Sequence, residues 1–112
     1  MATYVCVFGR LHRLEEKEAF EAAFAQVSRT VLGSVDGILR DELINDTNDP
    51  YAYILMSVWQ DKEAWAKWQR APIHEEQVGL LQRYWKGQGV KVYHTVYTIE
   101  QADILQEESL AS

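Results

Sequence analysis

The sequence predicts an α+β domain in which four strands form one antiparallel sheet and two helices cover it. Two observations lead to this prediction. Four segments are rich in β-branched and aromatic residues, and two segments between them space apolar residues as an amphipathic helix does. At 112 residues, the chain is long enough for one hydrophobic core and too short for a second.

The N-terminal third predicts the first strand and the first helix. Residues 3–8 form an unbroken β-branched and aromatic run that Gly9 closes, which is typical of a buried strand. Between residues 15 and 32, apolar side chains recur every three or four positions and therefore share one helical face. Gly33 is expected to end this helix.

The two central strands are predicted at residues 38–44 and 51–59, joined by a polar loop at 45–50. The second of them is apolar at successive positions, so that Tyr53 points to one face of the sheet and Ile54 to the other. Strands of this kind are normally buried on both faces, and two helices on one side cover only one face. We therefore expect a homodimer in which two sheets pack face to face.

The C-terminal half predicts an interrupted helix and the last strand. Asp61 is placed to cap the helix, and Pro72 interrupts it because proline cannot continue a helical hydrogen-bond ladder. We expect the helix to resume after Pro72 and to continue until Gly87 and Gly89 stop it, with the last strand at 90–99. The resulting order is β-α-β-β-α-β, the ferredoxin-like arrangement.

The net charge of −6 comes mainly from the C-terminal end. The last thirteen residues carry four acidic and no basic side chains, which leaves 11 basic and 13 acidic residues in the rest. A nearly neutral body without a basic cluster argues against nucleic acid as a partner. We treat residues 1–99 as the domain and 100–112 as an acidic tail, in which Asp103 is placed to cap a short turn.

Membrane association and export are not expected. No apolar run approaches the roughly 18 residues that span a bilayer. The first residues lack the basic and long apolar stretch of a secretory signal, which favours a cytoplasmic protein. The single cysteine, Cys6, has no partner for a disulfide and lies in an apolar strand, where a packing role is favoured over a nucleophilic one.

The histidines do not have the spacing of a metal site. His12, His74 and His94 form no pair four residues apart, and one cysteine adds no ligand cluster. His94 shares strand parity with three valines, so we expect it to be buried among them. His74 follows the helix break at Pro72, where an exposed and a functional histidine are equally consistent with the pattern.

Aromatic residues are numerous around the third strand and the interrupted helix. Trp59, Trp65, Trp68 and Trp85 are expected to be mainly packing residues. The same clustering is also typical of a pocket for a planar ligand. Free backbone groups at the break near Pro72 favour a cleft at that point.

Residues 58–74, VWQDKEAWAKWQRAPIH, resemble the signature of the antibiotic biosynthesis monooxygenase (ABM) family. The shared pattern is a strand that ends in Trp, an acidic cap, a helix with aromatic residues, and a break made of a small residue, Pro, any residue and His. Residues 35–39, VDGIL, are similar to the segment that begins the family's second strand. The resemblance extends over residues 3–99 and implies a dimeric α+β barrel.

The resemblance also implies a function. The family includes cofactor-independent oxygenases of aromatic compounds, quinol-type oxygenases and heme-degrading monooxygenases. A cofactor-independent enzyme acting on a small aromatic or quinol-type substrate in a hydrophobic pocket is the expectation that we adopt. Its catalytic residues are expected to be Trp68, which stacks on the substrate, with His74 or Arg10 handling charge.

Three further residues are expected to bind the substrate: Tyr53, Trp65 and Gln77. No metal is expected in this site, and no cofactor is required in this interpretation. A small hydrophobic or aromatic ligand is therefore the expected partner besides a second copy of the chain.

Two alternatives remain open. The tryptophan spacing is most similar to the heme-degrading branch, whose tryptophan maps onto Trp68 but whose asparagine falls near Gly9 and whose axial histidine falls on Gln77 or Val78. Neither Gln77 nor Val78 replaces imidazole as a heme ligand, so heme binding would have to use His74. The other alternative is a non-catalytic dimer that binds a small ligand on the same fold.

Overall fold

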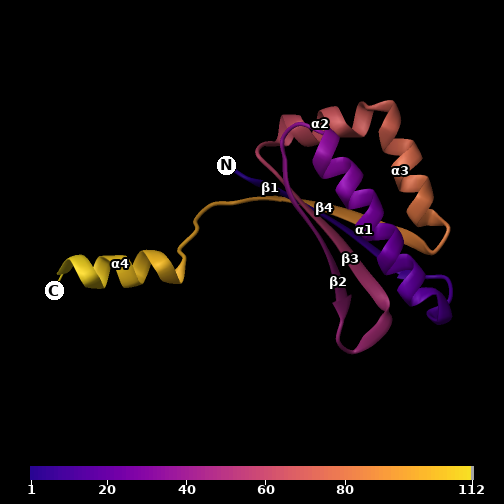
Figure 1. Ribbon diagram of the computed structural model, residues 1–112, viewed down its shortest axis with the longest axis horizontal. Helices are drawn as coiled ribbons and strands as arrows, with labels where there is room; N and C mark the ends of the chain where they lie inside the picture. Colours follow the sequence, from indigo (N-terminus) through magenta and orange to yellow (C-terminus); the bar gives the residue numbers. More distant parts are fainter. Residues whose placement is uncertain (112) are drawn as a thin grey trace.

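The computed structural model describes residues 1–111 of the chain, and its elements follow the predicted order (Figure 1). The strands are β1 (Thr3–Leu11), β2 (Ile38–Asp46), β3 (Asp49–Trp59) and β4 (Trp85–His94). The helices are α1 (Lys17–Ser34), which follows a short 3₁₀ turn at Leu14–Glu16, then α2 (Lys62–Arg70), α3 (Pro72–Gln82) and α4 (Gln101–Ala111). No helix among the described residues is long and apolar enough to cross a membrane.

The four strands form one antiparallel sheet in the order β2-β3-β1-β4. Both central strands, β1 and β3, therefore have a neighbour on each side, which agrees with their continuous apolar character. This order and the alternation of elements confirm the predicted ferredoxin-like α+β fold.

Helix α1 covers one face of the sheet and supplies much of the core. Phe20, Val27 and Val31 are buried on the helix, and Phe20 is 0% exposed. Phe20 meets the Tyr53 ring edge to face, with ring centres 5.1 Å apart. The helix continues through Gly33, which was predicted to end it, because the chain reverses only at Gly37 with a φ of 85°.

The interruption of the second helical segment is confirmed at the predicted residues. Asp61 caps α2, and its side chain accepts a hydrogen bond of 2.8 Å from the backbone N–H of Ala64. Pro72 is the first residue of α3, a position that needs no backbone N–H. One segment therefore becomes two helices with separate axes (Figure 1).

The predicted end of α3 and the predicted bounds of the last strand were wrong. The helix ends at Gln82, and β4 begins at Trp85, so Gly87 and Gly89 lie inside the strand. A contact distant in sequence explains this difference. A Cβ at Gly9 would lie 2.4 Å from the Trp85 ring, so the missing side chain of Gly9 leaves the space in which Trp85 packs. Local glycine spacing does not report such a contact.

The second face of the sheet is apolar at its centre and has no helix over it in the described chain (Figure 1). The register pairs Phe8 with Ile54 and Cys6 with Met56, on the face opposite to Tyr53. The predicted apolar character of both faces is therefore present. The expectation that His94 is buried was wrong: β4 is an edge strand, and His94 is exposed on it.

The C-terminal segment projects from the domain. After His94 the chain leaves the sheet, and α4 lies apart from the other helices (Figure 1). Val96 and Tyr97 are 81% and 79% exposed in this projecting segment. The radius of gyration is 16.7 Å, against about 13 Å for a compact chain of this length. Asp103 was predicted to cap a short turn, but it is the third residue of α4, and its side chain accepts a hydrogen bond of 3.2 Å from the backbone N–H of Glu100, which precedes the helix.

Candidate functional site

Trp68 and His74 lie against each other at the break between α2 and α3. Their ring centres are 5.0 Å apart with an angle of 80° between the ring planes, an edge-to-face contact. Trp68 is in the last turn of α2, and His74 is in the first turn of α3. The short connection at Ala71 brings the two rings together, because the His74 N–H bonds to the Ala71 carbonyl at 3.0 Å.

The other tryptophans divide between the core and the surface of this site. Trp59 is 1% exposed and lies behind Trp68, with ring centres 6.4 Å apart. Trp85 is 5% exposed and packs on Phe20 in the core. Trp65 is half-buried on α2 and has no ring contact with another aromatic residue within residues 1–110. Two of the four are therefore core residues, as the composition predicts.

The imidazole of His74 is kept neutral by its surroundings. Burial lowers the pKa of His74 below its ordinary value of 6.5, and the neighbouring Glu75 carboxylate opposes this change only in part. Its ring nitrogens make no hydrogen bond with another described side chain or carbonyl. A neutral imidazole with a free nitrogen is suited to accept a proton from an acidic hydroxyl near neutral pH.

Gln77 lies one helical turn after His74 on the inner side of α3. The residue is 7% exposed, and its amide has no hydrogen-bond partner among the described residues. No fully enclosed side-chain nitrogen or oxygen in that part of the chain lacks a partner. The Gln77 amide is therefore not fully enclosed and retains some contact with solvent.

A hollow of about 250 Å³ borders Trp68 between the end of α1 and the break of the second helical segment. We call it the tryptophan hollow. Apolar side chains from Val35, Trp68, Ala71 and Ile73 line one part of it. His74 contacts the Trp68 ring but does not line this hollow.

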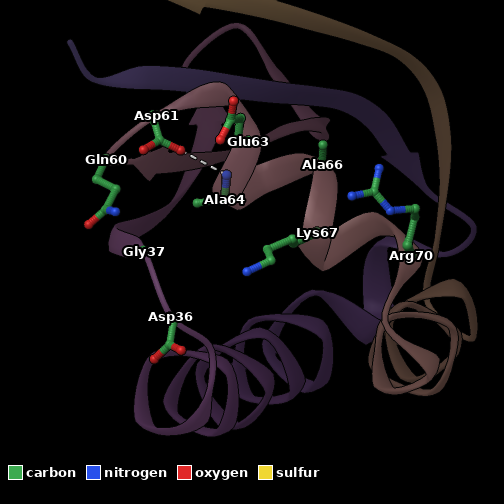
Figure 2. Close-up of a pocket in the computed structure, with 9 residues that line it drawn as sticks. All are labelled: Asp36, Gly37, Gln60, Asp61, Glu63, Ala64, Ala66, Lys67 and Arg70. Carbon is green, nitrogen blue, oxygen red and sulfur yellow. Dashed lines mark hydrogen bonds between the residues drawn. The ribbon is translucent and has the colours of Figure 1, made fainter.

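A second hollow, of about 430 Å³, lies beside the first turns of α2 (Figure 2). We call it the polar hollow, because Asp36, Gln60, Lys67 and Arg70 are among its lining residues. Its wall includes Gly37, where a Cβ would lie 2.5 Å from the Cβ of Ala64. The glycine therefore allows the chain before β2 to pack closely on α2.

Two of the predicted site residues lie at the other end of the sheet. Arg10 pairs with Ala52 in the register, and Trp59 is seven residues further along β3, about 23 Å at the rise of a strand. Arg10 forms an ion pair of 2.5 Å with Asp49. The structure thus brings Trp68, His74 and Gln77 into one region and leaves Arg10 outside it.

Tyr53 also lies away from the Trp68–His74 pair and has a structural environment of its own. The residue is 2% exposed. Its hydroxyl donates to Glu21 at 2.6 Å and accepts from Lys17 at 2.5 Å, and Lys17 also donates to Asn45 at 2.8 Å. Burial raises the pKa of Tyr53, while the hydrogen bond from Tyr53 lowers the pKa of Glu21. The hydroxyl is therefore engaged within the protein.

The described residues do not form a metal centre. No group of three His, Cys, Asp or Glu side chains in the described chain is placed to hold a metal ion. The position expected for an axial heme ligand is occupied by Gln77 and the half-buried Val78, whose side chains do not ligate heme iron as imidazole does. The His74 ring is in edge-to-face contact with the Trp68 ring. These residues do not fit the ligand set of a heme-degrading site.

Lys67 and its neighbours in the polar hollow were missed by the sequence prediction. A lysine on a helix is ordinarily a solvated residue, and nothing in its local pattern separates it from Lys62 on the same helix. The one feature of the sequence that could have indicated Lys67 is its position next to Trp68. Asp36 lies in the connection before β2, and Gln60 lies in the connection after β3. Only the fold places them together beside α2.

The sequence profile of the antibiotic biosynthesis monooxygenase family matches residues 10–78, which is more than half of the chain and includes α2 and the start of α3. The chain belongs to this family. The match confirms the resemblance carried by residues 58–74.

Solved structures in and near the ABM family share the fold at low sequence identity. SnoaB, a cofactor-independent oxygenase from Streptomyces nogalater, is 16% identical with a TM-score of 0.75, over 89% of this chain and 98% of SnoaB. HapK from Hahella chejuensis is 16% identical with a TM-score of 0.74, over 89% and 97% of the two chains. A conserved protein from Methanosarcina mazei is 15% identical with a TM-score of 0.70, over 83% and 91%. A sequence search of curated proteins finds no match.

Proposed function

We propose that this ABM-family protein is a cofactor-independent monooxygenase of a small aromatic or quinol-type substrate, with Trp68 and His74 at its active site. The observation that carries the proposal is the edge-to-face Trp68–His74 pair, whose tryptophan borders a hollow that is apolar on one side. A flat aromatic surface and a neutral imidazole are the two groups that binding and deprotonating a phenol require. The SnoaB structure supports the same chemistry, because that protein is a cofactor-independent oxygenase with this fold.

The reaction needs no external reductant, because the substrate supplies all the electrons. For a hydroquinone, one ring C–H is replaced by C–OH and the ring is oxidised to the quinone, while the second oxygen atom leaves as water. 1,4-Naphthohydroquinone and O₂ would thus give 2-hydroxy-1,4-naphthoquinone and H₂O. His74 accepts the hydroxyl proton, Trp68 packs on the ring, and the Gln77 amide hydrogen-bonds the resulting anion. The electron-rich anion then reacts with O₂ in a site that excludes bulk water.

The functional unit that we propose is a homodimer. The uncovered sheet face has apolar side chains at its centre, including Phe8, Ile54 and Met56. A second copy of the same face would remove them from water. The projecting segment after His94 exposes Val96 and Tyr97 and would pack on the partner in such a pair.

Oxygen consumption with 1,4-naphthohydroquinone tests the proposed activity. We expect His74→Ala to lower kcat/KM about 100-fold, the range for loss of a general base. Trp68→Ala should raise KM because the stacking surface is lost. His94→Ala is the matched control, since His94 is exposed on β4, and it should leave both constants unchanged.

The stoichiometry separates this reaction from simple oxidation of the hydroquinone. Oxygen insertion releases water, whereas uncatalysed oxidation releases hydrogen peroxide, from which catalase returns half of the oxygen. Unchanged turnover in both site variants would show that the site is elsewhere. Activity that appears only after hemin is added would instead support the heme alternative.

A further inference from the structure

The tryptophan hollow and the polar hollow are adjoining parts of one cleft along α2. Three residues, Asp36, Ala64 and Lys67, line both of them. Their shared wall is the segment before β2 on one side and the inner side of α2 on the other (Figure 2). A ligand that fills the tryptophan hollow therefore has the polar hollow as its next available space.

The two ends of this cleft differ in chemistry. Val35, Trp68 and Ile73 make one end apolar and suited to an aromatic ring. The other end carries charged and amide groups, and Lys67 stands where the two ends meet. A ligand that matches both ends has a ring and a polar or charged substituent.

Two cations line the polar hollow, Lys67 and Arg70, and of these two only Lys67 also lines the tryptophan hollow. Figure 2 shows its side chain extending into the polar hollow, with the carboxylate of Asp36 turned away from it. The ion pairs found within residues 1–110 join other residues: Arg10–Asp49, Lys17–Glu21 and Arg40–Glu42. The Asp61 carboxylate is already occupied as the cap of α2. The carboxylates of Asp36, Asp61 and Glu63 also line the polar hollow, but none of them forms an ion pair with Lys67 within residues 1–110.

We propose that Lys67 binds the carboxylate of the substrate, which makes the substrate class an aromatic carboxylic acid whose ring packs on Trp68. Lys67 and Trp68 are consecutive on α2 and point in different directions around the helix, yet both line the tryptophan hollow. A carboxylate attached directly to the ring, or through one carbon, is the substituent that we assign to the Lys67 ammonium. The inference rests on the proposed function for the site it uses, and it adds the charge of the substrate.

Equilibrium binding of an unreactive pair of ligands tests this assignment without turnover. The probes are 2-naphthoate and the neutral 2-naphthamide, which have the same ring and nearly the same shape. By calorimetry, we expect the intact protein to bind naphthoate about tenfold more tightly, which is the scale of a charge-assisted hydrogen bond. Lys67→Gln should remove this difference by weakening naphthoate alone, and Lys67→Arg should retain it.

Two further variants locate the effect. Trp68→Ala should weaken both ligands, because the ring contact is common to them. Lys62→Gln removes the same charge from the first turn of α2, outside both hollows, and should leave the preference for naphthoate intact. An equal effect of Lys62→Gln and Lys67→Gln would overturn the assignment, because it would show a long-range charge effect and not a contact.

The remaining outcomes also decide between the two proposals. Failure of the intact protein to bind either ligand, or equal affinity for both, overturns the carboxylate site. A preference for naphthoate that depends on Lys67, with no oxygen uptake on any hydroquinone, overturns the oxygenase and leaves the carboxylate site in place.

Discussion

At the scale of single residues, the burial of His74 beside Trp68 bears on its proposed role as a base. Because burial lowers the pKa of His74, the imidazole remains unprotonated to a lower pH than a solvated histidine does. A base acts only in its unprotonated form. The pH at which it loses its proton therefore sets the acid side of the activity profile.

The first prediction concerns this profile. We expect kcat/KM to rise with pH while His74 loses its proton, with a midpoint below pH 6.5, the ordinary pKa of histidine. The pH dependence of oxygen uptake measures this directly. A midpoint above 6.5 would contradict the assignment of His74 as a buried base.

Asp41 is a second residue whose environment has a measurable consequence. Burial raises its pKa from 3.8 to about 6, although the Ser28 hydroxyl donates a hydrogen bond of 2.7 Å to its carboxylate. Between these two values the folded protein binds more protons than the unfolded chain. The free energy of unfolding therefore falls as the pH rises through this interval.

The second prediction is that Asp41→Asn stabilises the protein at neutral and higher pH. The amide keeps an acceptor for Ser28 and removes the cost of burying a charge, which amounts to about 1–3 kcal/mol. Urea unfolding should show this gain at about pH 8 and almost none at about pH 3.5. Glu76→Gln, which removes one charge from an exposed position on α3, is the control. An equal rise in the free energy of unfolding of the control variant would show that the stabilisation comes from the change in net charge and not from the burial of Asp41.

At the scale of elements, the position of α2 depends on a close approach at Gly37. Gly37 has a φ of 85°, and a Cβ added to it would lie only 2.5 Å from the Cβ of Ala64. The Gln60 backbone N–H bonds to the Gly37 carbonyl at 2.8 Å, so the chain before α2 is also held at this point. Both walls of the cleft meet here.

The third prediction follows from this approach. Gly37→Ala should lower the free energy of unfolding by about 1–3 kcal/mol, because the new Cβ is strained and meets α2. Gly33→Ala is the matched control. A Cβ at Gly33 meets nothing within 4 Å inside α1, so that substitution should raise stability by about 0.5–1 kcal/mol. A stable Gly37→Ala protein would mean that the two walls are not in contact.

The elements that depend on local signals were predicted from the sequence, and those that depend on distant contacts were not. Asp61 and Pro72 act within one turn of their own positions, so the break between α2 and α3 was predicted at the right residues. The start of β4 depends on the space that Gly9 leaves for Trp85, more than seventy positions away in the chain. The glycines in β4 were therefore mistaken for the end of a helix.

The candidate site divides in the same way. Trp68 and His74 are six positions apart across the break, so their contact follows from local geometry. Arg10 was expected beside them, yet the register places it at the far end of the sheet. Lys67 was not singled out, because its availability depends on which carboxylates the fold turns toward it.

At the scale of the whole molecule, the domain has an incomplete surface. The sheet face opposite α1 carries apolar side chains at its centre, and Lys91 lies on its β4 side with its ammonium 5.8 Å from the centre of the Phe8 ring. The segment after His94 projects away with its apolar side chains exposed. These features support the homodimer that we propose.

The fourth prediction is that a charge at the centre of this face produces a folded monomer. We expect the natural chain to sediment as a dimer at micromolar concentration and Met56→Glu to sediment as a monomer with an unchanged circular dichroism spectrum. Leu80→Glu is the control, because Leu80 is half exposed on α3, away from this face. A natural chain that sediments as a monomer would contradict the proposed assembly.

The central claim is that this molecule inserts oxygen into an aromatic substrate without a cofactor. Its most direct test is turnover of 1,4-naphthohydroquinone under ¹⁸O₂ by protein treated with a chelator and supplied with no heme. The account predicts one labelled oxygen atom in 2-hydroxy-1,4-naphthoquinone, and loss of this product in His74→Ala. An unlabelled product, or a labelled product that forms only when iron or hemin is added, would contradict it.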